Sequence, residues 1–342
     1  MQRPTVNDIA RAAGVSLATV DRVLNARPGV RDQTISRVHE AIEKIGYVRD
    51  VSAANLARQR HYRLAFVLPE GPGQFLSALR DAIAEAAQRS IADRTDITVV
   101  SVPAHDPHAL ARALNALDCD QIDGVAIMAP ETPHVRDAVK RLKDGGVATV
   151  ALVSDLPNSE RDHFVGINNV AAGRTAAVLM GRFLGGRTCK VLVLVGSMQA
   201  RDSIERRLGF DQVMAEQFPS VDVLPSIEGH DDAETIGRVV STALDAHREI
   251  AGVYSLGSGN RALTDCLRGR GVANDLVVVA HELTPHTRDA LNTNAIDAVI
   301  TQDVGHVIRS ALRVLRSKSD GLEIVRSQER IRIDIVMKEN LP

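Results

Sequence analysis

The sequence lacks tryptophan altogether and is poor in other aromatic residues, which make up 3% of its 342 residues. Its hydrophobic cores must therefore rely on Val, Leu, Ile and Ala. Long apolar runs are also missing, because no segment reaches the roughly 18–20 apolar residues that a helix needs to cross a bilayer. The first residues lack the apolar stretch of roughly 7–15 residues that marks a secretory signal. These absences predict a protein that stays in the cytoplasm and has no membrane partner.

Cysteine is scarce, and its spacing excludes several kinds of site. The three cysteines, Cys119, Cys189 and Cys266, are odd in number and far apart, so they form neither a redox CxxC pair nor a zinc cluster. We expect structural thiols, since free cysteine is among the residues most often buried. Eleven histidines are scattered without metal-ligand spacing. The sequence thus predicts no metal and no cofactor, and it contains no P-loop, G-x-S-x-G or HExxH motif.

What is present is an ordinary globular balance, with 44% hydrophobic and 25% charged residues. At about 100–200 residues per domain, the length predicts two or three domains. The net charge of −2 hides an asymmetry along the chain. Residues 1–62 carry 10 Lys and Arg against 6 Asp and Glu, whereas residues 63–342 carry 31 against 37. A basic N-terminal segment on an acidic body indicates an anionic partner at one end.

The basic segment has the pattern of a helix-turn-helix. Thr5 followed by Asp8 resembles a capping box that opens a first helix, and Gly14 is placed to end it. Ser16 can cap a second helix with the sequence LATVDRVLN, after a tight Ala-Gly-Val-Ser turn. A third helix is predicted over residues 32–45, where apolar residues recur at helical spacing. The same pattern would also suit a small helical bundle without a nucleic-acid role.

The segment TVNDIARAAGVSLATVDRVLN, followed by GYVRDVSAANLAR, resembles the DNA-binding head and hinge of the lactose-repressor (LacI/GalR) family. The resemblance implies a helix-turn-helix DNA-binding domain over residues 1–49 and a hinge helix with linker over residues 50–62. Two residues depart from the family pattern. Asp21 stands where Ser is usual, and Asn55 replaces the common Gln or Ser of the hinge. Neither change disrupts the helical pattern, although Asp21 adds a negative charge near the phosphates.

The resemblance also implies how this head meets its partner, a double-stranded, pseudo-palindromic DNA operator bound by a homodimer. The second helix lies in the major groove with its first residues facing the base edges. Leu17, Ala18 and Arg22 match the base-reading positions, and Arg22 can grip a guanine with two hydrogen bonds. In the hinge, Asn55 is a further DNA-binding candidate and Leu56 matches an apolar wedge in the minor groove. The candidate phosphate contacts are Thr5, Ser16, Thr19 and Asn25.

From residue 63 the chain alternates apolar runs with helical stretches, the pattern of parallel sheets with helical crossovers. The predicted strands cover residues 64–68, 97–102, 124–128, 148–153, 190–195, 221–225, 252–256, 276–280 and 298–301, with a last strand within 331–337. The predicted helices include residues 75–90, 132–144, 171–184, 206–216 and 235–247. This body resembles the two-lobed periplasmic-binding-protein-like (type I) fold of the same repressor family. The expected fold class is therefore an N-terminal all-α helix-turn-helix head plus an α/β body of doubly wound parallel sheets.

The resemblance makes residues 63–342 an effector-binding and dimerisation domain. We expect lobe 1 over about residues 63–165 and 297–322, and lobe 2 over about residues 166–296 and 323–342. In open α/β sheets a ligand lies beyond the carboxyl ends of the strands, where the loops of this body are rich in carboxylates and amides that suit a polyhydroxylated ligand. The candidate effector-binding residues are Glu70, Gln74, Phe75, Asp155, Asn169, Arg206, Asn260, Glu282 and Gln302.

Arg206 matches the arginine that grips the sugar in the family, and four further candidates match other effector contacts by position, namely Asp155, Asn169, Glu282 and Gln302. Plainer roles stay open for two of these residues: a surface salt bridge for Arg206, and capping of a helix at Thr284 for Glu282. The sequence as a whole predicts a transcriptional regulator, a repressor above all, that is controlled by a sugar or sugar derivative and is not an enzyme.

Two other functions remain possible on the sequence. Residues 257–262 form a G-x-G-x-x-A pattern after a predicted strand, and Glu282 follows 20 residues later, as in a dinucleotide-binding fingerprint. That pattern predicts an NAD-dependent oxidoreductase that uses the loop Gly257-Ser258-Gly259. The second alternative is a sugar-binding protein without a regulatory role, in which the basic head would have no purpose.

Overall fold

The computed structural model describes residues 4–24, 28–45, 60–71, 73–104, 106–257 and 259–342. The chain divides into two compact units, Met1–Arg60 and His61–Pro342, which we call the head and the body. The predicted hinge helix and the candidates Asn25, Asn55 and Leu56 lie outside the described residues, as does Ser258 of the glycine-rich loop.

The described part of the head consists of three helices, α1 (Val6–Ala13), α2 (Leu17–Leu24) and α3 (Asp32–Ile45), as the sequence predicted. The Asp8 carboxylate accepts hydrogen bonds from the backbone N–H and the hydroxyl of Thr5, at 2.9 and 2.7 Å. Gly14 ends α1 in the left-handed conformation, with φ of 65°. Ser16 then caps α2, because its hydroxyl accepts the backbone N–H of Thr19. One face of each helix is buried in a small core that includes Ile9, Ala13, Val20, Val38 and Ala41.

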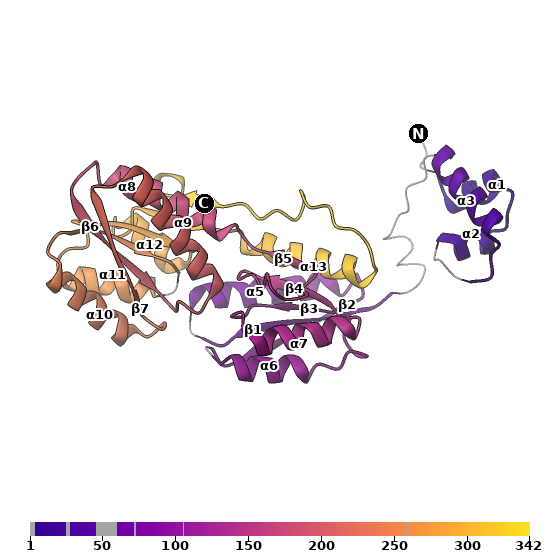
Figure 1. The fold of residues 1–342 in the computed structure, drawn as a ribbon, viewed down its shortest axis with the longest axis horizontal. Helices are drawn as coiled ribbons and strands as arrows, with labels where there is room; N and C mark the ends of the chain where they lie inside the picture. The colour runs from indigo at the N-terminus through magenta and orange to yellow at the C-terminus, as the bar shows by residue number, and fades with distance from the viewer. Residues whose placement is uncertain (1–3, 25–27, 46–59, 72, 105, 258) are drawn as a thin grey trace. The chain divides into compact units, whose positions relative to one another are not determined.

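The first lobe of the body is a parallel sheet in the order β2-β1-β3-β4-β5. Its strands are β1 (Tyr62–Pro69), β2 (Thr95–Val102), β3 (Gly124–Ile127), β4 (Ala148–Leu152) and β5 (His163–Val165). Helices α5 (Gln74–Ser90) and α13 (Val304–Ser319) cover one face, and α6 (Pro107–Asn115) and α7 (Pro133–Asp144) cover the other (Figure 1). In β1, Leu64, Phe66 and Leu68 therefore join one core, while Ala65 and Val67 join the other.

The second lobe is a sheet in the order β11-β10-β9-β8-β6-β7, parallel except for the pair β10–β11. Its strands are β6 (Cys189–Val195), β7 (Val221–Glu228), β8 (Ile250–Ser255), β9 (Val277–His281), β10 (Ala298–Thr301) and β11 (Asp334–Val336). Helices α8 (Asn169–Phe183) and α9 (Arg201–Gln217) pack on one face. The other face carries α10 (Ala233–Ala246), α11 (Asn260–Gly269) and α12 (Pro285–Asn292), and a short 3-10 turn, η1 (Lys338–Asn340), follows β11.

The topology confirms the predicted two-lobed fold and differs from the sequence prediction in four details. Strand β10 pairs with β9, so residues 298–301 belong to the second sheet and not to lobe 1 as expected. Strand β5 was missed because it has only three residues, two of them half-buried. Helix α9 begins at Arg201, five residues earlier than predicted. Of the three cysteines, Cys189 is buried, whereas Cys119 and Cys266 are only half-buried.

Among the described helices, none is long and apolar enough to cross a membrane.

Candidate functional site

A cavity of about 610 Å³ opens where the carboxyl ends of the strands of both lobes face each other. Its wall comes from the segments that follow β1, β2, β3 and β4 in the first lobe and β6, β7, β8 and β9 in the second. Six of the nine predicted effector residues line it: Glu70, Gln74, Phe75, Arg206, Asn260 and Glu282. Helical connections thus bring together residues that are up to about two hundred positions apart, at the place where open α/β folds bind ligands.

Arg206 is the centre of a buried hydrogen-bond network in this cavity. Its side chain is 2% exposed, which excludes the surface salt bridge left open by the sequence. The guanidinium donates to Asn169 Oδ1 at 2.9 Å, to the carbonyl oxygen of Leu256 at 2.6 Å and to Glu282 Oε1 at 3.3 Å. A guanidinium held on three sides is fixed in orientation, so it presents a defined surface to a ligand.

Glu282 carries a carboxylate with one oxygen in use and one free. Oε1 accepts from Arg206 and, at 3.1 Å, from Gln302 Nε2, whereas the buried Oε2 has no hydrogen-bond partner among the described residues. Burial raises the pKa of Glu282, and the neighbouring guanidinium and amide oppose that rise. Glu282 does not cap the helix that follows, because Thr284 itself caps α12. The free oxygen is therefore a ready acceptor for a ligand.

Three predicted residues do not line the cavity. Asn169 and Gln302 lie behind it, where they hold Arg206 and Glu282 in place. Asp155 is engaged elsewhere: its carboxylate is paired with the guanidinium of Arg161, which contacts both of its oxygens. The prediction of a direct ligand contact by Asp155 thus disagrees with this structure, because a partner six residues along the chain occupies the carboxylate.

A close approach between α8 and α9 sets the position of Arg206. A Cβ atom added at Gly173 would lie 1.9 Å from the carbonyl oxygen of Arg206, and one added at Gly209 would lie 2.0 Å from that of Val170. Only glycine allows the two helix backbones to meet at this distance. The small residues of α8 therefore bring the guanidinium of α9 under the cavity and within reach of Asn169.

The wall of the cavity also holds strained backbone. Val153, Asp231 and Glu282 all have positive φ, at 65°, 58° and 69°, a region that residues other than glycine rarely adopt. Val153 is β-branched, for which this conformation is least favourable. Such strain costs on the order of 1–3 kcal/mol per residue and concentrates at ligand sites. The convergence of three strained residues on one cavity supports its assignment as a binding site.

Some lining residues were not among the sequence candidates. Asp202 and Ser203 lie in the first turns of α9, which the sequence analysis treated as a loop, and Asp106 follows β2, whose loop was overlooked. Asp231 follows β7 and was not among the candidates either. The signal that could have found Asp202 is its place after strand β6, since helices that follow parallel strands begin at the ligand edge of the sheet.

One hydrogen bond joins the two lobes across the mouth of this cavity. Gln74 Oε1 at the start of α5 accepts the backbone N–H of His286 in the first turn of α12, at 3.1 Å. The first N–H groups of a helix have no partner within the helix, so the glutamine supplies one from the opposite lobe. Both Gln74 and His286 line the cavity.

The glycine-rich loop after β8 serves the same cavity. Gly257, Gly259 and Asn260 line it, and Gly259 has a φ of 96° that glycine adopts freely. Asn260 is buried and ties the strand ends together, accepting from Ser255 Oγ at 2.7 Å and donating to the His281 carbonyl at 3.0 Å. Its amide is thus positioned as a support for the strand ends, and one oxygen of the neighbouring Glu282 is bound by Arg206.

In the head, the start of α2 presents the predicted DNA-reading side chains. Leu17 is 49% exposed, a large fraction for a leucine, and Ala18 beside it is also exposed. The exposed Arg22 makes no side-chain hydrogen bond to the described residues. Thr5 and Ser16 are exposed and Thr19 is half-exposed. An apolar pair and a free guanidinium on one short helix offer contacts to a thymine methyl and to a guanine edge.

Comparisons with known families match both units of the chain. Residues 5–50 match the family described as bacterial regulatory proteins, lacI family, and residues 64–323 match the periplasmic binding protein domain. Catabolite control protein A of Streptococcus mutans is 30% identical over 162 residues, a stretch that spans 46% of this chain and about half, 47%, of that relative. The transcriptional regulator DegA of Bacillus subtilis is 24% identical over 82% of each chain.

Solved structures share the fold of the body. A solute-binding protein of an ABC transporter from Burkholderia graminis, in complex with D-arabinose, superposes with a TM-score of 0.74 at 24% identity, covering 82% of this chain and 96% of that one. A putative LacI transcriptional regulator from Bacteroides fragilis gives 0.72 at 18% identity, with 82% and 98% covered. With the head and the cavity described above, these matches show that the chain belongs to the LacI family of bacterial regulatory proteins, in which a helix-turn-helix head is joined to a periplasmic-binding-protein domain.

Proposed function

We propose that this protein is a transcriptional repressor whose affinity for DNA is controlled by a small polyhydroxylated effector bound in the cavity between the lobes. The observation that carries the proposal is the buried Arg206–Glu282 pair, which leaves one carboxylate oxygen free at a ligand cavity in a chain that also carries a DNA-reading head. Its site of action would be the cytoplasm, where its DNA is found.

The head would read the operator through the start of α2. Arg22 would pair with a guanine and Leu17 would contact a thymine methyl, while the hydroxyls of Thr5, Ser16 and Thr19 would meet phosphates. A homodimer would place two heads on the two halves of a pseudo-palindromic site. Asn25, Asn55 and Leu56 are assigned to the same surface by the family resemblance alone.

The body would bind the effector with donors and acceptors from both lobes. Arg206 and Glu282 would contact ligand hydroxyl groups from the second lobe, and Glu70, Gln74 and Phe75 would close over it from the first. Asn169, Asn260 and Gln302 would hold these groups in place. Asp155 would contribute by keeping its loop fixed through Arg161. A sugar is the natural candidate, because its hydroxyls need several fixed polar partners at once.

Control of DNA binding would follow from thermodynamic linkage between effector binding in the cavity and operator binding by the head. A ligand that binds one arrangement of the lobes more tightly shifts the population toward it, and the operator affinity changes by the same coupling free energy. The hydrogen bond between Gln74 and His286 joins the two lobes and would break if the cleft opened.

The test is selection of operators from a random DNA pool, repeated with a panel of sugars, polyols and sugar derivatives. We expect a two-fold-symmetric site whose enrichment one compound abolishes. Failure to enrich any site at low salt would refute the DNA-binding function. Turnover or nicotinamide fluorescence on addition of NAD(H) to the purified protein would instead support the oxidoreductase alternative. Effector binding without any effect on DNA would support a sugar-binding protein with no regulatory role.

A further inference from the structure

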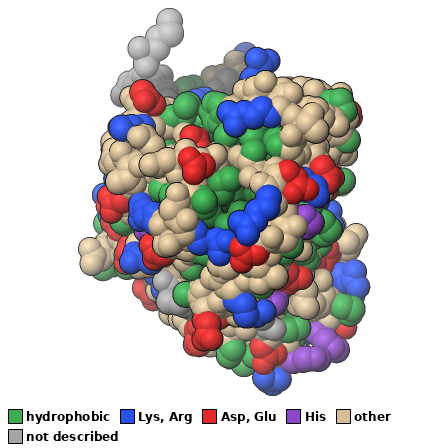
Figure 2. Space-filling model, turned by 90° about the vertical axis from the view of Figure 1, so that its left-hand side faces the viewer, with side chains coloured by type: hydrophobic (Ala, Val, Ile, Leu, Met, Phe, Trp, Pro, Cys, Tyr) green, Lys and Arg blue, Asp and Glu red, His purple; other side chains and the backbone are tan. Residues whose placement is uncertain are grey.

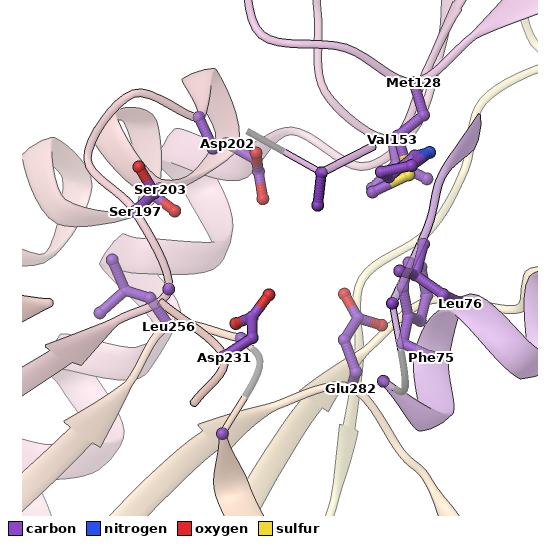
Figure 3. Close-up of a pocket in the computed structure, with 18 of the residues that line it drawn as sticks. Phe75, Leu76, Met128, Val153, Ser197, Asp202, Ser203, Asp231, Leu256 and Glu282 are labelled. Atoms are coloured by element: carbon purple, nitrogen blue, oxygen red, sulfur yellow. The ribbon is translucent and has the colours of Figure 1, made fainter. Parts of the chain in front are cut away.

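More acidic than basic side chains line the cavity, and its polar and apolar side chains are unevenly distributed. Among the described residues that line it, the carboxylates are Glu70, Asp106, Asp202, Asp231, Asp265 and Glu282, whereas the only guanidinium groups are those of Arg206 and Arg261. Figure 3 shows the carboxylates of Asp202, Asp231 and Glu282 pointing from three different elements into the open centre. Apolar side chains from the first lobe, among them Phe75 and Met128, lie on the opposite side.

The face of the molecule drawn in Figure 2 shows no matching excess of negative charge. On the face drawn in Figure 2, acidic and basic side chains are interspersed around hydrophobic ones, with no broad region of one sign. The body as a whole has only six more acidic than basic residues in 282 positions. The carboxylates of the cavity therefore need an explanation of their own.

Two of these carboxylates, Asp106 and Asp265, are each paired at 3.8 Å with an arginine outside the lining, Arg112 and Arg268. The two guanidinium groups of the lining add one ion pair among the described residues, that of Arg206 with Glu282. Arg206 is divided among Asn169, the Leu256 carbonyl and a single oxygen of Glu282. Arg261 is exposed and makes no salt bridge within the part of the chain that the structure describes.

Two of the carboxylates are free to take a ligand. Among the described residues no hydrogen bond reaches the carboxylate of Asp202, which lies near enough to Glu282 for its charge to raise the pKa of that group. Glu282 is 6% exposed, and its Oε2 has no partner among the described residues. A half-buried Asp202 beside the buried Glu282 is electrostatically unfavourable without a ligand, because like charges repel more strongly where solvent screens them less.

A protonated amine would relieve this repulsion, and a neutral or anionic group would not. An ammonium group has three donors and can donate to Asp202, Asp231 and Glu282 at once with charge-assisted hydrogen bonds, which are about twice as strong as neutral ones. A phosphate or carboxylate group would meet three negative charges instead.

From this arrangement we infer that the effector is a polyhydroxylated amine, such as an amino sugar, whose ammonium group lies between Asp202, Asp231 and Glu282. This inference rests on the proposed function of the cavity as the effector site. It adds that the ligand carries a positive charge. The hydroxyl groups of the ligand would take the remaining contacts with Arg206 and Gln74.

Calorimetric titration of the full chain with matched ligands tests the inference. The panel pairs D-glucosamine, D-galactosamine and D-mannosamine with their parent hexoses, their N-acetyl forms and the corresponding uronic acids. At least one amine should bind ten times or more tightly than its parent hexose, and acetylation, which removes the charge, should abolish that gain. Tighter binding of a parent hexose or a uronic acid than of every amine overturns the inference, and so does the absence of binding by all amines at millimolar concentration.

Variants separate charge recognition from a structural effect. Asp202→Asn keeps the size of the side chain and should lower the affinity for the amine about tenfold while changing that for the parent hexose less than twofold. Asp289→Asn, an exposed change on α12 away from the cavity, is the matched control and should change neither. Equal losses for amine and hexose in Asp202→Asn would overturn the inference. An operator whose binding responds to a neutral sugar would leave the proposed function standing while this inference fails.

Discussion

Replacing Arg206 by alanine should destabilise the body as well as remove a ligand contact. The change leaves the buried carboxylate of Glu282 with Gln302 as its single remaining hydrogen-bond partner among the described residues. Removing one partner of a buried ion pair costs about 3–5 kcal/mol, because the remaining charge stays buried without compensation. For a body of this size that corresponds to a fall in Tm on the order of 10 °C.

The loss of stability in Arg206→Ala should depend on pH and should be larger at higher pH. Burial raises the pKa of Glu282 above its ordinary value of 4.5, and Arg206 opposes that rise, so the pKa should rise further in Arg206→Ala. Between the unfolded and the folded pKa, the folded protein binds more protons than the unfolded one, so its stability falls as the pH increases. We therefore expect a smaller loss of stability at pH 5 than at pH 8, because the raised pKa leaves more of Glu282 protonated at the lower pH.

The assay is thermal unfolding followed by circular dichroism at these two pH values for the wild type, Arg206→Ala, Glu282→Gln and the double variant. If the uncompensated carboxylate causes the loss, Arg206→Ala should cost clearly less in the Glu282→Gln background than alone, in a double-mutant cycle. The reasoning is refuted if the two costs are equal, or if the loss is as large at pH 5 as at pH 8. Loss of hydrogen bonds to Asn169 and Leu256 would then be the dominant cause.

Three further predictions concern the helix packing, the cleft and the head. Gly173→Ala should lower stability by about 1–3 kcal/mol, because the α8–α9 contact has no room for a methyl group. Gly237→Ala on α10, where a Cβ would meet nothing within 4 Å, should instead stabilise the body by about 0.5–1 kcal/mol, and equal effects in chemical denaturation would contradict this account. Gln74→Ala removes the hydrogen bond between the lobes and should weaken effector binding by about 0.5–1.5 kcal/mol in calorimetry without lowering Tm; unchanged affinity would show that this contact is not part of the closed state. Arg22→Ala should lose about 1–3 kcal/mol of preference at one base pair in competition binding across operator variants, whereas a uniform loss at all sites would indicate a phosphate contact.

Elements with a strong local signal could be predicted from the sequence. The capping pair of Thr5 and Asp8, the left-handed Gly14 and the apolar spacing of α3 each act between neighbours in the chain, and the structure has these helices where the pattern indicated. Strands β3, β4 and β10 are short and buried at every residue, so continuous apolar runs located them. Strand β5 escaped because three residues carry too little pattern.

The candidate site was predictable by topology but not in detail. Position after a strand and the family resemblance together selected Arg206 and Glu282, since every parallel strand ends at the same edge of the sheet. The same rule selected Asp155, which the structure pairs with Arg161, and it could not rank Asp202 above its neighbours in α9. The position of a loop indicates which residues lie near the cleft. The hydrogen-bond and ion-pair partners of each side chain decide which of these residues can contact a ligand.

The sequence by itself determined the two units of this protein, the order of their elements and the family to which they belong, since these depend on local capping, periodicity and motif spacing. Only the tertiary structure decided the chemistry of the cavity. Arg206 meets Asn169 and Glu282 across separations of 37 and 76 residues, and a glycine contact between two helices holds it there. Which carboxylates are neutralised and which stay free depends on such distant contacts, because a charge in the interior is governed by what surrounds it in space and not by its neighbours along the chain.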